Sequence, residues 1–255
     1  MKPDTEQLYL RQAGIGTPFL LIHGLLVNGD MFAPVFDTFA RRYRVLAPDL
    51  RGHGHSKHLA PPYTVEQHAY DLALLLKSLS ISSAIVLGYS QGGAVAQQLA
   101  IDYPNLVSRL ILACTFAYNQ ITLQEKLEGK ITPWLIRLLS TNQLARMTTR
   151  VMTGLTPGQA QWLETMIASN EKLRMVEATK AMLRFDSRAR LRDVRCPTLI
   201  IAGANDSAVP LHHAKMLAQG ISGAKLHVVP NAGHEMIFTH AQELVDVVQM
   251  FLREL

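Results

Sequence analysis

Short runs of almost wholly apolar residues recur along this chain, and they restrict its fold more than any other feature. Most of the later runs show no alternation of polar and apolar residues, which is typical of parallel strands with both faces covered. The seven candidate strands are Leu8–Arg11, Phe19–Ile22, Arg44–Ala47, Ala84–Leu87, Val107–Ala113, Thr198–Ala202 and Lys225–Val229.

Segments with helical periodicity separate these runs. A repeated alternation of strand and helix predicts an α/β protein, with a mostly parallel, doubly wound sheet that carries helices on both faces. The helices are expected at about Met31–Arg41, Val65–Leu79, Gln91–Asp102, Leu211–Gln219 and His240–Leu252.

The middle of the chain, from about residue 118 to residue 190, interrupts this alternation. It contains helical patterns such as Trp134–Leu139 and Glu171–Leu183 and no convincing strand. Thr132-Pro133 and Thr156-Pro157 are typical of a helix N-cap followed by the first turn. We therefore expect an all-helical insertion between two strands of the sheet.

The composition is that of an ordinary soluble globular protein, with 48% hydrophobic and 18% charged residues. The stretch Met1–Leu10 lacks the apolar segment of a signal peptide, and no apolar run approaches the ~18 residues that span a bilayer. Cys114 and Cys196 are too few for a disulfide framework in a chain of this size. We expect a cytoplasmic protein with reduced cysteines.

The net charge of +5 is unevenly distributed. Residues 115–195 carry 13 lysines and arginines against 7 aspartates and glutamates, so the excess of positive charge lies in the middle of the chain. Such an excess can attract an anionic substrate or surface. The simpler interpretation, which we favour, is a set of helices with solvated basic faces. Aromatic residues do not alternate with the basic ones, so we expect no nucleic-acid partner.

The strongest chemical signal is the segment Gly88-Tyr89-Ser90-Gln91-Gly92-Gly93, which follows one candidate strand and begins a candidate helix. A sharp strand-to-helix turn needs residues without a Cβ on either side, and it projects the central serine hydroxyl above the sheet edge. The start of the helix also provides amide groups that stabilise negative charge. Ser90 is therefore the predicted nucleophile.

A serine hydroxyl needs a base to activate it, and the base needs an orienting acid. His234 follows the candidate strand Lys225–Val229, and Asp206 follows the candidate strand Thr198–Ala202. Because the carboxyl ends of parallel strands meet at one edge of a sheet, we expect Ser90, Asp206 and His234 to form a catalytic triad.

The oxyanion formed during acyl transfer needs amide donors beside the nucleophile. We expect them to be the backbone N–H groups of Leu25, which follows the candidate strand Phe19–Ile22, and of Gln91. His23 is expected to hold its loop rather than to transfer protons. A second group of histidines, His53, His55 and His58, has no neighbouring cysteine or carboxylate that completes an obvious metal site, so we interpret it as a structural loop.

Taken together, these residues resemble the α/β-hydrolase superfamily over essentially the whole chain. Related haloalkane dehalogenases and epoxide hydrolases use an aspartate nucleophile, which the serine at position 90 does not match. The motifs that carry the resemblance are His23-Gly24, Asp49-x-Arg51-Gly52-x-Gly54-x-Ser56, the glycine turn around Ser90, Gly203-x-x-Asp206 and Gly233-His234.

The resemblance implies an α/β-hydrolase fold with an inserted helical cap that covers the active site. Residues 118–190 would form this cap, and residues 1–117 and 191–255 would form the core domain. Substrate choice would then depend mostly on the inner face of the cap. Candidate substrate-binding residues there are Trp134, Leu138, Met147, Met152, Trp162 and Met166.

We thus expect a serine hydrolase that cleaves carboxylic esters or lactones through an acyl-enzyme, with no cofactor and no metal. The same triad also supports hydrolysis of carbon–carbon bonds, perhydrolysis or acyl transfer, and a ligand-binding signalling protein of this fold can retain it. The expected partner is a small-molecule ester or lactone, not a nucleic acid or a membrane, and the expected state is a monomer or homodimer.

Overall fold

A computed structural model describes residues 7–254 of the chain. Its seven strands form one sheet in the order β1-β3-β2-β4-β5-β6-β7, in which β1 runs antiparallel to β3 and the other strands are parallel. The sheet confirms the predicted fold class. The strands are β1 (Leu10–Ala13), β2 (Pro18–Ile22), β3 (Arg44–Pro48), β4 (Ala84–Tyr89), β5 (Val107–Ala113), β6 (Thr198–Gly203) and β7 (Lys225–Val229).

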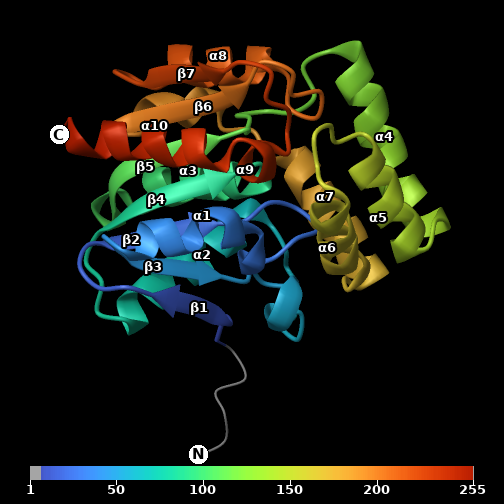
Figure 1. The fold of residues 1–255 in the computed structure, drawn as a ribbon, viewed down its shortest axis with the longest axis horizontal. Helices are drawn as coiled ribbons and strands as arrows, with labels where there is room; N and C mark the ends of the chain where they lie inside the picture. Colours follow the sequence, from blue (N-terminus) through green and yellow to red (C-terminus); the bar gives the residue numbers. More distant parts are fainter. Residues whose placement is uncertain (1–6, 255) are drawn as a thin grey trace, which may run out of the picture.

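Helices cover both faces of the sheet (Figure 1). Alternate residues of β2 enter different buried clusters: Phe19 and Leu21 pack on one face, and Leu20 and Ile22 pack on the other. The first cluster includes residues of α1 (Ala33–Ala40) and α10 (Ala241–Arg253), and the second includes residues of α2 (Val65–Ser78), α3 (Gln91–Asp102) and α8 (Leu211–Gly220).

Four further helices lie between β5 and β6, where the sequence predicts a helical segment. They stand together beside one end of the sheet (Figure 1). Their buried residues, such as Ile136, Leu144 and Leu163, belong to the same cluster as Tyr89 and Met236. These two residues lie in the rest of the described chain, residues 7–117 and 191–254, for which we use the name sheet domain without implying that it folds separately. The helices are α4 (Leu123–Leu138), α5 (Thr141–Arg150), α6 (Pro157–Ala168) and α7 (Lys172–Arg184).

One predicted helix start is wrong. Pro133 lies inside α4, and the helix begins after Thr122 instead. Thr122 forms a complete capping box with Glu125, which satisfies amide groups at that end. The proline removes the helical donor to the carbonyl of Gly129, and one residue earlier the hydroxyl of Thr132 donates to the carbonyl of Glu128 at 2.8 Å. Thr156-Pro157 does form an N-cap and first turn, at the start of α6.

Short helices complete the described chain. They are the 3₁₀ helices Gly29–Phe32, Gly54–Ser56, Pro104–Leu106 and Arg188–Asp193, and the single-turn helix α9 (Met236–Thr239). Within residues 7–254, no helix is both long enough and apolar enough to cross a membrane. The expectation that Met1–Leu10 is not a signal peptide concerns a stretch of which residues 1–6 lie outside the described residues.

The order of strands determines where a ligand can enter. β2 lies between β3 and β4, so the chain leaves β2 toward one side of the sheet and later leaves β4 toward the other. Connections that diverge in this way open a crevice at the carboxyl ends of the strands, which is the usual binding position in doubly wound sheets. The loops that follow β2 and β4 therefore flank this crevice.

Candidate active site

Ser90 occupies a strained turn between β4 and α3. Its backbone angles, φ 56° and ψ −123°, lie outside the regions that residues with a side chain prefer. Glycines make the turn possible, because a Cβ on Gly88 would collide with the carbonyl of Gly92, and one on Gly92 would collide with the carbonyl of Ile22. The turn is further held by Thr115, whose hydroxyl donates to the carbonyl of Ser90 at 2.6 Å.

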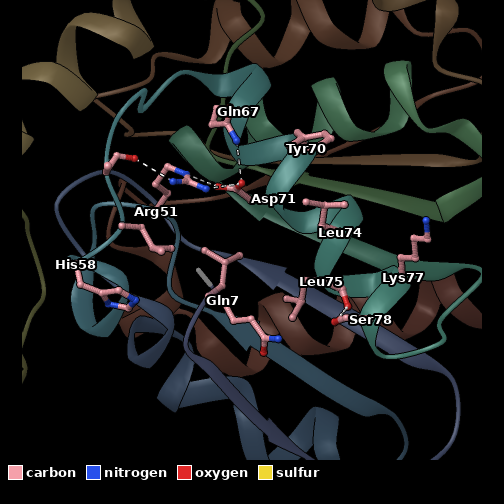
Figure 2. Close-up of a pocket in the computed structure, with 13 residues that line it drawn as sticks. Gln7, Arg51, His58, Gln67, Tyr70, Asp71, Leu74, Leu75, Lys77 and Ser78 are labelled. Atoms are coloured by element: carbon pink, nitrogen blue, oxygen red, sulfur yellow. Dashed lines mark hydrogen bonds and ion pairs between the residues drawn. The ribbon is translucent and has the colours of Figure 1, made fainter. Parts of the chain in front are cut away.

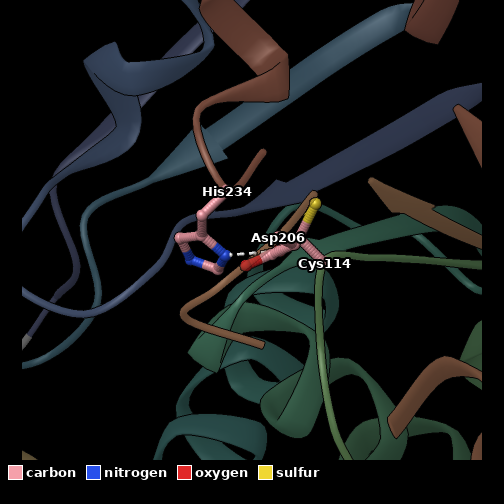
Figure 3. A group of neighbouring side chains, drawn as sticks. All are labelled: Cys114, Asp206 and His234. Atoms are coloured by element: carbon pink, nitrogen blue, oxygen red, sulfur yellow. Dashed lines mark hydrogen bonds and ion pairs between the residues drawn. The ribbon is translucent and has the colours of Figure 1, made fainter. Parts of the chain in front are cut away.

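His234 and Asp206 meet Ser90 at the carboxyl edge of the sheet. Nε2 of His234 lies 3.0 Å from Oγ of Ser90, and Nδ1 of His234 lies 2.9 Å from Oδ2 of Asp206. Figure 3 shows the His234–Asp206 pair, with Cys114 beside it. The three residues predicted as a triad are thus brought together, at distances that suit transfer of a proton from the hydroxyl to the imidazole.

The carboxylate of Asp206 is held in place on both oxygens. Oδ1 accepts the amides of Ala208 at 3.0 Å and Val209 at 2.7 Å, so Oδ2 remains directed at His234. Burial of His234 opposes its protonation, but the charge and hydrogen bond of Asp206, with the charge of Glu235, outweigh it and raise the pKa of His234 above its ordinary value. The imidazole is therefore a stronger base than a free histidine.

Tyr89, which sequence reasoning did not single out, supports the base. Its hydroxyl donates to the carbonyl of His234 at 2.7 Å and accepts the amide of Ile237 at 3.3 Å. Burial raises the pKa of Tyr89 well above its ordinary value, so the hydroxyl keeps its proton. The position between Gly88 and Ser90 marks this residue as part of the turn, but nothing in the sequence indicates its distant partner.

The predicted oxyanion donors lie beside the nucleophile. Leu25 lines the same cavity as Ser90, and its neighbour Gly24 packs so closely that a Cβ there would be 3.2 Å from Cβ of Ser90. Gln91 is the first residue of α3, where amides have no partner within the helix. Their role as oxyanion donors remains a prediction.

His23 is fully buried and bonded on both nitrogens. Nε2 accepts the amide of Leu50 at 2.9 Å, so the proton resides on Nδ1, which lies 2.8 Å from the carbonyl of Gly24. Burial lowers the pKa of His23 to about 4, an effect that the hydrogen bond to Gly24 only partly opposes. A neutral imidazole thus ties the loop after β2 to the loop after β3.

The other predicted loop histidines also contact the protein itself. The amide of His55 donates to Oδ2 of Asp49 at 2.7 Å, and its Nδ1 lies 3.1 Å from the same oxygen. Nδ1 of His53 lies 3.1 Å from the carbonyl of Arg51, and Nδ1 of His58 lies 3.0 Å from the carbonyl of His55. These contacts support the structural interpretation of the segment.

A cavity of about 80 Å³ opens at Ser90 between the sheet domain and the helical segment. Ser90 and His234 line it, and most of the remaining lining residues are apolar. From the helical segment come Thr148, Met152, Leu163 and Ile167. From the sheet domain come Gly24, Leu25, Leu26, Val27, Met31, Tyr89, Glu235, Ile237 and Phe238.

Of the six residues expected to bind substrate, only Met152 lines this cavity. Trp134, Leu138 and Met147 are exposed on the outside of the helical segment. Met166 is buried in the core cluster, and Trp162 packs edge-on against Phe238 with ring centroids 5.8 Å apart. The helical pattern of the sequence shows which residues share a helix face, but the packing of α4 to α7 decides which face meets the cavity.

A larger hollow lies elsewhere on the molecule, along α2 (Figure 2). Arg51 crosses it and forms a two-pronged ion pair with Asp71, at 2.6 and 2.8 Å. No member of the predicted triad lines this hollow. We therefore place the candidate active site in the smaller cavity, where nucleophile and base converge.

Two groups of side chains among residues 7–254 have the donor types of a metal site. The first is Cys114 with Asp206 and His234, but His234 and two amides already occupy the oxygens of Asp206. The second joins α4 to α8: Nε2 of His212 and of His213 each lie 2.9 Å from Oε1 of Glu125. The other oxygen of Glu125 accepts the amides of Ile121 and Thr122, so this carboxylate also caps a helix.

Known proteins resemble this chain in sequence and in fold. The chain is 29% identical to a poly(3-hydroxyalkanoate) depolymerase of Ectopseudomonas oleovorans over 245 residues, which cover 93% of this chain and 85% of the relative. The structure of the present chain resembles that of a thermophilic esterase from Thermogutta terrifontis, with a TM-score of 0.87 and 27% identity. The match covers 97% of this chain and 93% of the esterase chain. An enol-lactonase from Burkholderia xenovorans gives a TM-score of 0.87, 25% identity and coverage of 96% of each chain.

The family comparison covers most of the molecule. The model of the alpha/beta hydrolase fold family matches residues 17–241, which include every strand from β2 to β7 and all three residues of the predicted triad. The chain belongs to the α/β-hydrolase fold family.

Proposed function

We propose that the protein hydrolyses small carboxylic esters or lactones with Ser90 as the nucleophile. The observation that carries this proposal is the chain of contacts from Ser90 Oγ to Nε2 of His234 and from Nδ1 to Asp206. The esterase, lactonase and depolymerase among the similar proteins support the same chemistry.

In the proposed reaction, Oγ of Ser90 attacks the ester carbonyl while Nε2 of His234 takes its proton. Asp206 stabilises the resulting imidazolium, and the amides of Leu25 and Gln91 stabilise the oxyanion. His234 then protonates the leaving alcohol, which leaves an acyl group on Ser90. A water molecule, deprotonated by His234, releases the acid and restores the hydroxyl.

The size of the cavity favours a short acyl group. A volume of about 80 Å³ is below the 150 Å³ or so of an apolar cavity that accepts benzene, so it suits an acyl chain of roughly two to four carbons. The charge within the cavity favours a neutral substrate, because Glu235 lines it and no lysine or arginine is among its lining residues. The basic excess of residues 115–195 therefore lies outside the site.

A series of p-nitrophenyl esters from acetate to decanoate, together with simple lactones, tests this proposal. We expect kcat/KM to be highest for the short esters and to fall at least tenfold for the longest, because overfilling a packed site costs about 1–3 kcal/mol. Ser90→Ala should abolish turnover, whereas Ser82→Ala, at an exposed position, should not change it.

A cavity variant makes the size argument sharper. Ile167→Ala should enlarge the cavity and move the preferred chain length upward, while Ser90→Ala should remove activity toward every chain length. Full ester turnover by Ser90→Ala would show that the nucleophile is elsewhere. An unchanged chain-length profile in Ile167→Ala would show that this cavity does not hold the acyl group.

A further inference from the structure

Helix α4 presents a row of large apolar side chains to the solvent. Its members recur every three or four residues along the whole helix, which places them on one face, about 80° wide. Their exposed fractions range from 42% to 83%. We call this face the α4 stripe, and it consists of Leu123, Leu127, Ile131, Trp134 and Leu138.

The opposite face of the same helix already packs against the protein. Ile136 is buried in the core cluster, and Gly129 lies close to the side chain of Leu183 in α7. The α4 stripe is therefore a second apolar face, which residues 7–254 leave uncovered. Contiguous apolar surface of this kind is uncommon on proteins that stay apart in water, and it usually marks a binding surface.

Three basic residues border the α4 stripe on one side. At 100° per residue, Lys126, Lys130 and Arg137 lie on a single flank next to Leu123 and Trp134. All three are exposed, and within residues 7–254 none has an ion-pair partner. The flank therefore carries three uncompensated positive charges along the apolar row.

The acidic residues of α4 do not neutralise this flank. Glu125 points toward the sheet domain, where it caps the helix and contacts His212 and His213. Glu128 lies on the other side of the α4 stripe and accepts a hydrogen bond from Gln124 at 2.8 Å. The two sides of the α4 stripe thus differ in charge.

We propose that the α4 stripe docks the protein onto a lipid bilayer that contains anionic phospholipids. A helix with Leu, Ile and Trp on one face and Lys and Arg beside it binds in the interface of such a bilayer, with its apolar face among the acyl chains and its basic residues at the phosphates. The helix lies on the surface and does not cross the membrane. This proposal departs from the expectation, made from the sequence, that the protein has no membrane partner.

The positive charges beside the α4 stripe favour an anionic lipid surface, rather than a second copy of the chain, as its binding partner. If two copies of α4 packed in antiparallel fashion about a two-fold axis, like flanks would face each other. Lys126, Lys130 and Arg137 would then oppose the same three residues of the other copy, with like charges in contact. An anionic lipid surface meets the same flank with opposite charge.

Flotation of the full-length protein with large unilamellar vesicles tests the proposal. One set of vesicles contains phosphatidylcholine alone, and the other contains phosphatidylcholine with 30% phosphatidylglycerol. We expect binding to the anionic vesicles, with a blue shift of Trp134 fluorescence, and much weaker binding to the neutral ones. Each basic residue near an anionic surface contributes about a fivefold change in partitioning, so Lys126→Glu/Lys130→Glu/Arg137→Glu should weaken binding by at least a hundredfold.

Matched variants separate the α4 stripe from other apolar surface. Trp134→Asp should abolish vesicle binding, whereas Met250→Asp, at a similarly exposed apolar position on α10, should not affect it. Both variants should keep wild-type circular dichroism and ester turnover, because neither residue lines the active-site cavity. This readout does not depend on the proposed hydrolysis.

Three outcomes would overturn the proposal. The first is failure of the wild-type protein to float with anionic vesicles, and the second is binding that Trp134→Asp leaves unchanged. The third is a dimer in sedimentation equilibrium that Trp134→Asp dissociates, because a second copy of the chain would then cover the α4 stripe.

Discussion

Acidification should destabilise this protein steeply, because it buries histidines in their neutral form. His23 and His53 are both fully buried, and burial lowers their pKa values to about 4 and about 3. In the unfolded chain, each would return to the ordinary value of about 6.5. Between these limits the unfolded chain binds more protons than the folded one, so stability is lost as the pH falls below 6.5.

The loss of stability at a given pH follows from the difference between that pH and the ordinary histidine pKa of about 6.5. At pH 5, each of these two histidines should lower the free energy of unfolding by about 2 kcal/mol, at 1.36 kcal/mol for each pH unit. His68, whose pKa burial holds well below its ordinary value, acts in the same direction. His234 acts in the opposite direction, since its raised pKa favours the folded state on acidification. A loss of about 4 kcal/mol from the first two is a large part of the 5–15 kcal/mol that stabilises most domains.

Urea denaturation at pH 7.5 and pH 5, followed by circular dichroism, measures this loss. The variant His53→Asn isolates the contribution of one histidine. The side-chain amide of the new asparagine can donate to the carbonyl of Arg51, as Nδ1 of His53 does. This variant should lose about 2 kcal/mol less than the wild type over the same pH interval. His58→Gln, at an exposed position, should lose as much as the wild type. Equal losses in His53→Asn and the wild type would refute the reasoning.

Three further predictions concern the nucleophile and its support. Asp206→Asn should lower kcat by about a thousandfold or more while the protein stays folded, because the imidazole loses its orienting charge; stopped assays with p-nitrophenyl acetate measure this. In the wild type, kcat/KM measured from pH 5 to pH 9 should rise and then level off with an apparent pKa above 6.5, because Nε2 of His234 must be unprotonated and its pKa is raised; a midpoint below 6.5 would contradict this. Gly92→Ala should lower Tm by 10 °C or more or prevent folding, since its Cβ would meet backbone carbonyls, whereas Gly158→Ala, which has open space around it, should leave Tm within a few degrees.

The sheet could be predicted from the sequence because its signals are local. A strand covered on both faces needs a short apolar run, and each of the seven runs forms a strand within two or three residues of the expected bounds. The positions of Ser90, Asp206 and His234 follow from the same signals, since each residue lies within five residues of the end of a parallel strand of one sheet. Their convergence needs only the strand order, not the detailed packing.

The cavity could not be predicted in the same way. Trp134 and Leu138 were expected to face the substrate, yet they lie in the α4 stripe, and Leu163 and Ile167 line the cavity instead. An apolar residue on a helix has the same local pattern whether its face meets a cavity, a core or the solvent. Only the tertiary packing of α4 to α7 distinguishes these cases. The assignment of residues 118–190 to a separate cap domain, and the cytoplasmic location, stay predictions.

Tyr89 links the strand that carries the nucleophile to the loop that carries the base. Ser90 and His234 are 144 positions apart in the chain, but the residue adjacent to Ser90 holds the carbonyl of His234 through its hydroxyl. The turn after β4 and the loop after β7 are thus joined twice, once by the side chains that react and once by a ring that takes no part in the reaction. A design that moves this serine and histidine into another sheet should therefore include the tyrosine, because it holds the backbone of the base independently of the catalytic contact.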